Sequence, residues 1–338
     1  MRAGAGPDVF RQIAPGRGAG LLRRAVPARA LQGLGRGGGG GGMSRRNAGK
    51  RLALIGCGAM GTALGLRLLG LGWEVRVYNR SPERTAPLRD AGASAHATPA
   101  EAVAGADWVA TVLTDSAALR ALLFGDNGIA SAPAAGRRLV DLGTHQPTQL
   151  AALGAEAAAA GWPLVEAPMT GSVHDASHGT LHFLVGGAEA DVEWASPLLW
   201  ALGRGVHHLG GLGAGNTAKL ALNLLVGVMA GGLGEAIALL RAHGLAVDSF
   251  LDALDGSGLA SPLYRRLGQR YLDGDHAPRF SLANLEKDLR WECEHALASG
   301  LQPRLAPALC RLLAPLSEEA KRRDYSALIA DLAGAPSC

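Results

Sequence analysis

The segment spanning residues 52–80 constrains the fold of this chain most strongly. Residues 52–55 are a short apolar run, typical of a strand that is buried on both faces. Next come residues 56–61, which have the spacing G-x-G-x-x-G, a helix expected over residues 62–71 and an alternating strand over Glu74–Tyr78. A strand, a glycine-rich turn, a helix and a second strand of this size predict a βαβ unit that binds a dinucleotide.

Each glycine of this turn has its own physical role. Gly56 permits the tight turn, Gly58 lets the backbone approach a pyrophosphate, and Gly61 lets the helix pack closely on the strand. Ala59, Met60 and the start of the helix offer backbone amides and the positive end of the helix dipole to the anion. One such motif is a weak signal in a chain with 49 glycines, and the flanking strands strengthen it.

The residues after the second strand select the dinucleotide. NAD-binding units usually place Asp or Glu there, where the carboxylate accepts a hydrogen bond from the ribose 2′-hydroxyl. This chain has Asn79, Arg80 and Ser81, so no carboxylate repels a 2′-phosphate, and Arg80 can hold that phosphate through a bidentate pair. We therefore predict NADP as the cofactor, with NAD less favoured. The alternative for Arg80 is a solvated turn residue.

Apolar runs farther along the chain extend the same α/β pattern. Short strands are expected within residues 91–97, 107–113, 138–142 and 164–167, with a helix over 100–104. In a doubly wound parallel sheet, ligands bind outside the carboxyl ends of the strands. Leu113 ends one of these strands, and Thr114, Ser116 and Thr144 follow two of them, so all four are predicted along the ribose and nicotinamide of the cofactor.

The pattern becomes helical near residue 213. Helices are expected over residues 216–240, 247–255, 281–299 and 304–321, with Gly or Pro between them. We predict an NADP-binding Rossmann domain over 49–212 and a helical domain for substrate binding and oligomerisation over 213–332. Residues 1–48 are rich in Gly, Ala and Arg and are expected to be a disordered extension. They fit either a transit peptide or a start annotated upstream of Met43.

Charge and cysteine usage exclude several classes of function. The formal net charge is +4, but residues 1–51 hold eleven basic side chains and the rest is acidic on balance, so no nucleic-acid partner is expected. Neither the four scattered cysteines nor the histidine pairs complete a ligand set, so no metal site is predicted. The cysteines indicate a cytoplasmic location, or an organelle if residues 1–48 are a targeting segment. No apolar run reaches the ~18 residues of a membrane helix.

One lysine in the helical half is a candidate for chemistry. Lys219 and Asn223 lie at i and i+4, so they share a face of a helix that Asn216 and Thr217 can cap. That helix is apolar on nearly all sides and is therefore expected to be buried. Lys219 either snorkels to the surface at the first turn or is held in a site.

A short segment after the last predicted strand of the sheet half is a candidate anion site. Thr170, Gly171 and Ser172 place two hydroxyl residues around a glycine, and such a loop can aim amides and hydroxyls at an anion. The alternative is a tight loop that only joins a strand to a helix. The neighbouring His174 and Asp175 are further candidates to line the site.

An ordered set of motifs resembles the β-hydroxyacid dehydrogenase family, which includes 3-hydroxyisobutyrate dehydrogenase. The resemblance covers residues 51–330, and the motifs are specific as a set, although most are common singly. The ending Asn79-Arg80-Ser81 looks most like the NADPH-using glyoxylate/succinic semialdehyde reductases. In chain order the motifs are Gly56 to Gly61, Asp141-Leu142-Gly143-Thr144, Ala167-Pro168-Met169-Thr170-Gly171-Ser172, Gly179-Thr180-Leu181, Val185-Gly186-Gly187, Gly213-Ala214-Gly215, Lys219 with Asn223, and Phe280 with Lys287-Asp288.

The resemblance implies a fold and an activity. The fold is a Rossmann doubly wound sheet followed by an all-α domain, as in 6-phosphogluconate dehydrogenase, within a homodimer or homotetramer. The activity is NADP-dependent hydride transfer between a small carboxylate-bearing aldehyde or ketone and its hydroxy acid. Lys219 is implied as the general acid/base, Asn223 as a ligand of the reacting oxygen, the loop 170–172 as the holder of the substrate carboxylate, and Lys287 as a cofactor contact.

Departures from the family pattern leave the substrate open. The family more often has Ser-Gly-Gly where this chain has Thr170, Gly171 and Ser172. An imine reductase of the same fold is the alternative enzyme, disfavoured because such enzymes commonly have Asp or Tyr in place of Lys219. The helical half is too short for 6-phosphogluconate dehydrogenase, and the presence of both Lys219 and Asn223 disfavours a non-catalytic NADP-binding module.

Overall fold

The computed structural model describes residues 49–334, so the predicted disordered extension lies outside the described residues. Six parallel strands form most of the sheet, in the order β3-β2-β1-β4-β5-β6 that is typical of dinucleotide-binding domains. Beyond β6, β8 lies antiparallel to β6 and β7, and β9 runs parallel to β8. The strands are β1 (Arg51–Ile55), β2 (Glu74–Tyr78), β3 (Ser94–Ala95), β4 (Trp108–Thr111), β5 (Leu139–Asp141), β6 (Leu164–Glu166), β7 (Met169–Thr170), β8 (Leu181–Gly186) and β9 (Gly203–Gly210).

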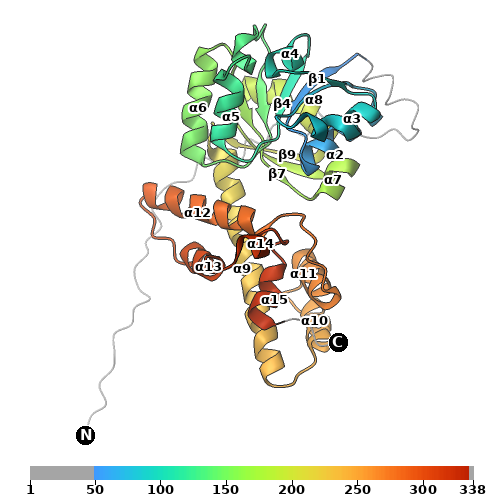
Figure 1. Ribbon diagram of the computed structural model, residues 1–338. Helices are drawn as coiled ribbons and strands as arrows, with labels where there is room; N and C mark the ends of the chain where they lie inside the picture. The colour runs from blue at the N-terminus through green and yellow to red at the C-terminus, as the bar shows by residue number, and fades with distance from the viewer. Residues whose placement is uncertain (1–48, 335–338) are drawn as a thin grey trace. The chain divides into compact units, whose positions relative to one another are not determined.

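Alternating strand residues build a separate core on each face of this sheet. In β1, Leu52 and Leu54 point into one core and Ala53 and Ile55 into the other, and none of the four is more than 1% exposed. In Figure 1, α5 and α6 cover one face, and α2 and α8 cover the other. The predicted doubly wound sheet is therefore confirmed. Its helices are α2 (Ala59–Gly70), the 3₁₀ turn η2 (Pro82–Thr85), α3 (Ala86–Asp90), α4 (Pro99–Val103), α5 (Ser116–Phe124), the 3₁₀ turn η3 (Ile129–Ser131), α6 (Pro147–Ala159), α7 (Val173–His178) and α8 (Glu189–Leu202).

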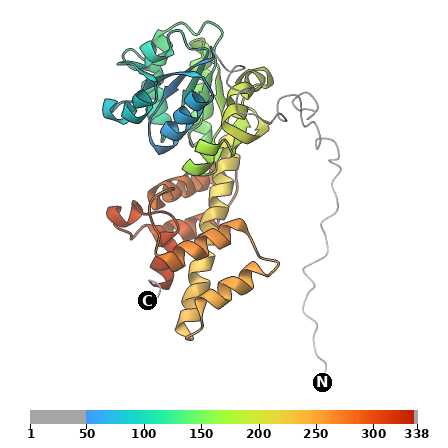
Figure 2. The same ribbon diagram turned by 90° about the vertical axis from the view of Figure 1, so that its right-hand side faces the viewer.

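The chain after the sheet is helical and is organised around one long helix. Figures 1 and 2 show α9 with α12, α13 and α15 packed along it. Gly227 and Gly234 allow this packing, because a Cβ at either position would lie only 3.0 Å from a leucine of α13 or α15. The helices are α9 (Ala214–Ala242), α10 (Val247–Asp255), α11 (Pro262–Asp273), α12 (Leu282–Ala298), α13 (Leu305–Leu313), α14 (Glu318–Lys321) and α15 (Ala327–Ala333).

Several predicted elements differ from the observed ones. Helix α2 begins at Ala59 rather than at residue 62, because the last residues of the glycine turn are themselves helical. The helix predicted over 304–321 is two helices, since Pro315 lies between α13 and α14 and cannot continue the backbone ladder. Several elements were not predicted from the sequence: η2, α3, η3, α6, α7, α8, α11, α15 and the strands β7 to β9.

The start of α9 also differs from the prediction. The helix begins at Ala214, its N-cap residue Gly213 has a positive φ of 97°, and no side chain of its own first turn caps it. The two residues expected to cap the helix make other contacts. The Thr217 hydroxyl donates to the Gly213 carbonyl, and the Asn216 side chain contacts residues of the sheet half. Glu166, at the end of β6, instead accepts from the amides of Gly213 and Gly215, so a distant carboxylate caps α9.

The length of α9 corrects one further expectation. By length and composition α9 is apolar enough to cross a membrane, although no apolar run of that size was expected from the sequence. In this structure 44% of its most apolar stretch is buried, and its inward side chains belong to the core shared with α12, α13 and α15.

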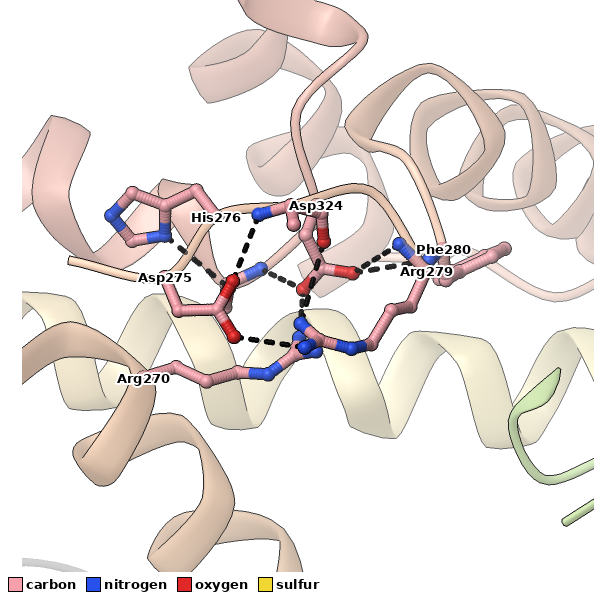
Figure 3. Close-up of polar contacts among 8 residues, drawn as sticks. Arg270, Asp275, His276, Arg279, Phe280 and Asp324 are labelled. Atoms are coloured by element: carbon pink, nitrogen blue, oxygen red, sulfur yellow. Dashed lines mark hydrogen bonds and ion pairs between the residues drawn. The ribbon is translucent and has the colours of Figure 1, made fainter. Parts of the chain in front are cut away.

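A buried carboxylate fixes the connection between α11 and α12. Figure 3 shows Asp324, which is fully buried, paired with Arg270 and accepting from the backbone amides of Arg279 and Phe280 at 3.1 and 3.0 Å. The amide of Asp324 in turn donates to the His276 carbonyl. These contacts hold the segment that leads directly into α12, which carries Lys287 and Asp288.

Candidate functional site

The glycine turn between β1 and α2 is fixed by close backbone packing. Gly56 has a φ of 105°, and its amide donates to the Tyr78 carbonyl at 2.9 Å. A Cβ at Gly56 would lie 2.4 Å from the Val112 carbonyl oxygen, and one at Gly61 would lie 1.9 Å from the Gly56 carbonyl oxygen. A Cβ at Gly58 would meet nothing within 4 Å. Gly56 and Gly61 therefore shape the turn, while Gly58 faces open space where a pyrophosphate can approach.

The N-terminus of α2 suits an anion. Its N-cap is Gly58, no side chain caps it, and no acidic residue lies in its first turn. The amides of Ala59, Met60 and Gly61 therefore keep their donors for a ligand, at the positive end of the helix dipole. These residues fit the pyrophosphate of a dinucleotide.

The turn after β2 is tied to the glycine turn by Asn79. Its Oδ1 accepts from the Cys57 amide and its Nδ2 donates to the Ser81 carbonyl, both at 2.9 Å. A carboxylate at position 79 would lack the second donor. Arg80 is exposed and has no hydrogen bond or ion pair within residues 49–334, so its guanidinium is available to a phosphate.

The loops after β4 and β5 contain the other predicted cofactor contacts. Thr114 is exposed, Leu113 is half-buried, and Ser116 is buried at the start of α5. Thr144 is half-buried, and its hydroxyl has no hydrogen bond with any described residue. The structure brings these residues to the carboxyl ends of β4 and β5, as the sheet topology predicts.

Four polar side chains of α9 and α12 form a cluster. Asp288 is 1% exposed and accepts from Asn223 Nδ2 at 2.6 Å, while Lys287 Nζ lies 2.9 Å from its other oxygen. Lys287 Nζ also donates to the Thr114 carbonyl at 3.2 Å and lies 3.8 Å from the centre of the Trp291 ring. The sequence places Asp288 only in the motif Lys287-Asp288, whereas the structure places it at the centre of this cluster.

Lys219 is the unpaired member of the cluster. It is half-buried, and its ammonium has no hydrogen bond or ion pair with another described residue. Burial lowers the pKa of Lys219, the carboxylate of Asp288 opposes that shift, and the charge of Lys287 adds to it. The amine is thus adjusted toward proton exchange nearer neutral pH than an ordinary lysine.

The loop predicted to hold the carboxylate of a substrate is bonded to a carboxylate of the protein itself, that of Asp175. Ser172 is the N-cap of α7, and Asp175 Oδ2 accepts from both its amide at 2.8 Å and its hydroxyl at 2.7 Å. Thr180 donates to the other oxygen of Asp175 at 2.9 Å. Gly171 has a φ of 134° and is exposed. Sequence reasoning noted Asp175 but missed this capping box, which the Ser-x-x-Asp spacing would have indicated.

Two surface cavities lie elsewhere. One, of about 270 Å³, lies between α10 and α11, and the other, of about 420 Å³, lies beside Trp194 and Arg137. Neither is lined by a predicted site residue. The candidate site is therefore defined by the side chains and backbone donors described above.

Comparisons with known proteins cover both halves of the chain. Residues 51–210 match the family described as the NAD binding domain of 6-phosphogluconate dehydrogenase. Residues 213–332 match the family described as NAD-binding of NADP-dependent 3-hydroxyisobutyrate dehydrogenase.

Individual relatives match over most of their length. An NAD-dependent L-serine dehydrogenase of Pseudomonas aeruginosa is 33% identical over 287 residues, or 82% of this chain and 96% of the relative. Glyoxylate/succinic semialdehyde reductase 1 of Arabidopsis thaliana is 29% identical over 71% of this chain and 83% of its own. The solved structure of Mycobacterium tuberculosis 3-hydroxyisobutyrate dehydrogenase with L-serine is 28% identical, covers 84% of this chain and 99% of its own, and has a TM-score of 0.76.

Proposed function

The chain belongs to the β-hydroxyacid dehydrogenase family, of the 3-hydroxyisobutyrate dehydrogenase type, and on that premise we propose its reaction. Its relatives indicate an NAD(P)-dependent dehydrogenase of hydroxy acids or semialdehydes. The reaction we propose is the NADP-dependent interconversion of a small carboxylate-bearing aldehyde or ketone and its hydroxy acid.

The observation that carries this proposal is the unpaired, half-buried ammonium of Lys219. The bound cofactor supplies the hydride for reduction of the carbonyl carbon. In that direction Lys219 donates a proton to the carbonyl oxygen, where negative charge develops, and in oxidation it takes the proton back. Asn223 has one amide hydrogen committed to Asp288, which fixes its side chain so that the second can orient the same oxygen.

Arg80 supports the choice of NADP. It is exposed and unpaired within the described chain, and Asn79 stands where a carboxylate would repel a 2′-phosphate. One relative is named as NAD-dependent, so both cofactors belong in the test.

The experiment is a panel of reductions with NADPH and NADH. Glyoxylate, succinic semialdehyde, methylmalonate semialdehyde and a cyclic imine are compared, with wild-type protein and Lys219→Ala. We expect NADPH-dependent turnover of at least one carboxylate-bearing carbonyl, and a loss of about 10²- to 10⁴-fold in kcat for Lys219→Ala with NADPH affinity retained. Unchanged turnover in the variant would sink the role of Lys219.

Two results would redirect the assignment. Turnover of the imine alone would favour an imine reductase. NADPH binding without turnover of any compound would favour a non-catalytic NADP-binding module.

We also propose that the chain forms a homodimer or homotetramer through α9. Leu222, Leu225 and Leu239 on this helix are 38%, 57% and 63% exposed, and an apolar surface of this kind is commonly covered by a partner. Light scattering during size-exclusion chromatography tests this proposal, and a monomer at micromolar concentration would contradict it.

A further inference from the structure

A chain of buried polar groups links the sheet to the first turn of α9. Its members are 0% exposed except Ser116, which is 8% exposed, and most of them have no part in the proposed proton transfer. Thr111 contacts Asp141, and Asp141 contacts His145. His145 contacts both Ser116 and Asn216, and Asn216 contacts Glu166 at the end of β6.

At the helix end, Glu166 docks α9 onto β6. One carboxylate oxygen accepts from the amides of Gly213 and Gly215 at 2.7 and 2.8 Å. The other accepts from the amide of Asn216 at 3.3 Å and from its side-chain Nδ2 at 2.5 Å. Every one of these donors lies within six residues of Lys219, so the contacts fix the part of α9 that carries the lysine.

At the sheet end, His145 is folded back onto Asp141. Its Nε2 lies 2.7 Å from Asp141 Oδ2 without forming a directed hydrogen bond. The other oxygen of Asp141 accepts from the Thr111 hydroxyl at 2.6 Å. Gly143 makes this possible, because a Cβ there would lie 2.5 Å from His145 Nε2. The position of the His145 ring therefore requires a residue without a Cβ at position 143.

His145 touches both sides of the candidate site. Its backbone amide donates to Asn216 Oδ1 at 2.7 Å, and its Nδ1 lies 3.3 Å from the Ser116 hydroxyl. Next to Ser116, Asp115 is buried enough to raise its pKa, but hydrogen bonds and the charges of His145 and Lys287 outweigh burial and lower that pKa overall. The loop 114–116 is thus contacted by His145 from the sheet and by Lys287 from α12.

We propose that His145 is a positioning residue that couples occupancy of the cofactor loop 113–116 to the placement of Lys219. Cofactor contact with the loop orders Ser116, and Ser116 holds the imidazole against Asp141. The backbone of His145 then holds Asn216, and Asn216 with Glu166 sets the first turn of α9. The inference rests on the proposed function in taking the loop 113–116 as the cofactor contact, and its kinetic readout also rests on Lys219 as the proton donor.

The test compares three variants by hydrogen exchange and by kinetics. His145→Ala removes the imidazole and leaves the backbone contact to Asn216 without its support. His145→Gln keeps a donor and an acceptor of similar reach. Gln146→Ala is the matched control, because Gln146 is a buried neighbour whose side chain, within residues 49–334, accepts only from the Gln149 amide and the Thr148 hydroxyl at the start of α6.

In the wild type, NADPH is expected to slow amide exchange in a peptide covering residues 213–219. His145→Ala should remove most of that cofactor-dependent protection, about tenfold in exchange rate, and lower kcat about 10- to 100-fold at saturating NADPH. His145→Gln should restore kcat to within about threefold of the wild type. Gln146→Ala should lower the melting temperature without changing either readout.

The idea is overturned if NADPH leaves exchange at 213–219 unchanged in the wild type, or if Gln146→Ala matches His145→Ala. It is also overturned if His145→Ala lowers the melting temperature but leaves both the cofactor-dependent protection and kcat unchanged. Should His145→Ala not fold, Ser116→Ala cuts the same chain more mildly and must reduce the cofactor-dependent protection. Exchange needs no substrate, so protection that depends on His145 in a protein without turnover would refute the proposed reaction and leave the coupling standing.

Discussion

The two ends of the candidate site are built in opposite ways. The glycine end consists largely of backbone groups from one stretch, in which Gly61 packs against the Gly56 carbonyl and Asn79 Oδ1 accepts from the Cys57 amide, across fewer than 25 residues. The lysine end consists of side chains on two helices, and its central hydrogen bond joins residues 65 positions apart. One end is set by local chain geometry, and the other by tertiary packing.

This difference concerns what holds each site in place. A backbone site is lost when an atom is added, because the carbonyls around Gly61 cannot move apart cheaply. A side-chain cluster is lost when a support is removed, because a buried charge then lacks its partner. We therefore expect an added group to disrupt the glycine end and a removed group to disrupt the lysine end.

The largest effect is expected from removing a support of the lysine end. Asp324→Ala leaves Arg270 without its buried partner and frees two backbone amides before α12. We expect a loss of about 3–5 kcal/mol in the free energy of unfolding, measured by urea denaturation. Asp255→Ala breaks the exposed pair with Arg265 and should cost less than about 1 kcal/mol. Equal losses in the two variants would contradict this view of the buried pair.

Adding one methyl group should disable the glycine end. Gly61→Ala places a Cβ 1.9 Å from the Gly56 carbonyl oxygen, so the turn and α2 must separate. The dissociation constant for NADPH, measured by fluorescence titration, is expected to rise about 100-fold, or about 2.7 kcal/mol. Gly70→Ala, in the same helix, meets nothing within 4 Å and serves as the control. Retained NADPH affinity in Gly61→Ala would show that the turn does not hold the cofactor.

Removing the arginine should change cofactor choice alone. Arg80→Ala deletes a charge-assisted contact of about 1.5–3 kcal/mol, so the KM for NADPH should rise about 10- to 100-fold. The KM for NADH should stay unchanged, and so should both values in Arg89→Ala, where another exposed arginine is removed. A parallel rise in both KM values for Arg80→Ala would exclude its selective role.

The smallest effect is a shift along the pH axis at the lysine end. Reduction needs protonated Lys219, so its rate should fall as pH rises through the pKa of that lysine. Burial lowers this pKa and Asp288 opposes the shift, so Asp288→Asn should move the alkaline limb of kcat down by about one pH unit. Glu294→Gln, on the exposed side of α12, should leave the limb in place. If the alkaline limb of kcat moved to higher pH in Asp288→Asn, the carboxylate of Asp288 could not be raising the pKa of Lys219.

The same contrast explains what sequence reasoning recovered. The strand Glu74–Tyr78 and the helix Val247–Asp255 were predicted with their observed bounds, since alternation and helical periodicity are local signals. Lys219 and Asn223 were paired by their i, i+4 spacing, which is local as well. The role of Asp288 as a buried counter-charge was not predicted, because nothing near it in the sequence distinguishes such a residue from one in an ordinary surface pair.

Long-range caps were beyond sequence reasoning for the same reason. Glu166 was predicted only as the end of a strand, and its role at α9 depends on a backbone 47 to 50 residues away. The expectation that Asn216 caps α9 used a local rule where a tertiary contact prevailed. The positions of β7, β8 and β9 likewise depend on pairing partners rather than on a period of their own.

The docking of α9 at its N-terminus also makes it a lever with a fixed pivot. At about 1.5 Å per residue, Lys219 lies about 9 Å from Gly213 and Leu239 about 39 Å. A tilt of about 5° about Gly213 would carry Leu239 through about 3.4 Å and Lys219 through only about 0.8 Å. Lys219 therefore moves little when the helix tilts. The end of α9 that carries Leu239 can adapt to other surfaces while the position of Lys219 is nearly unchanged.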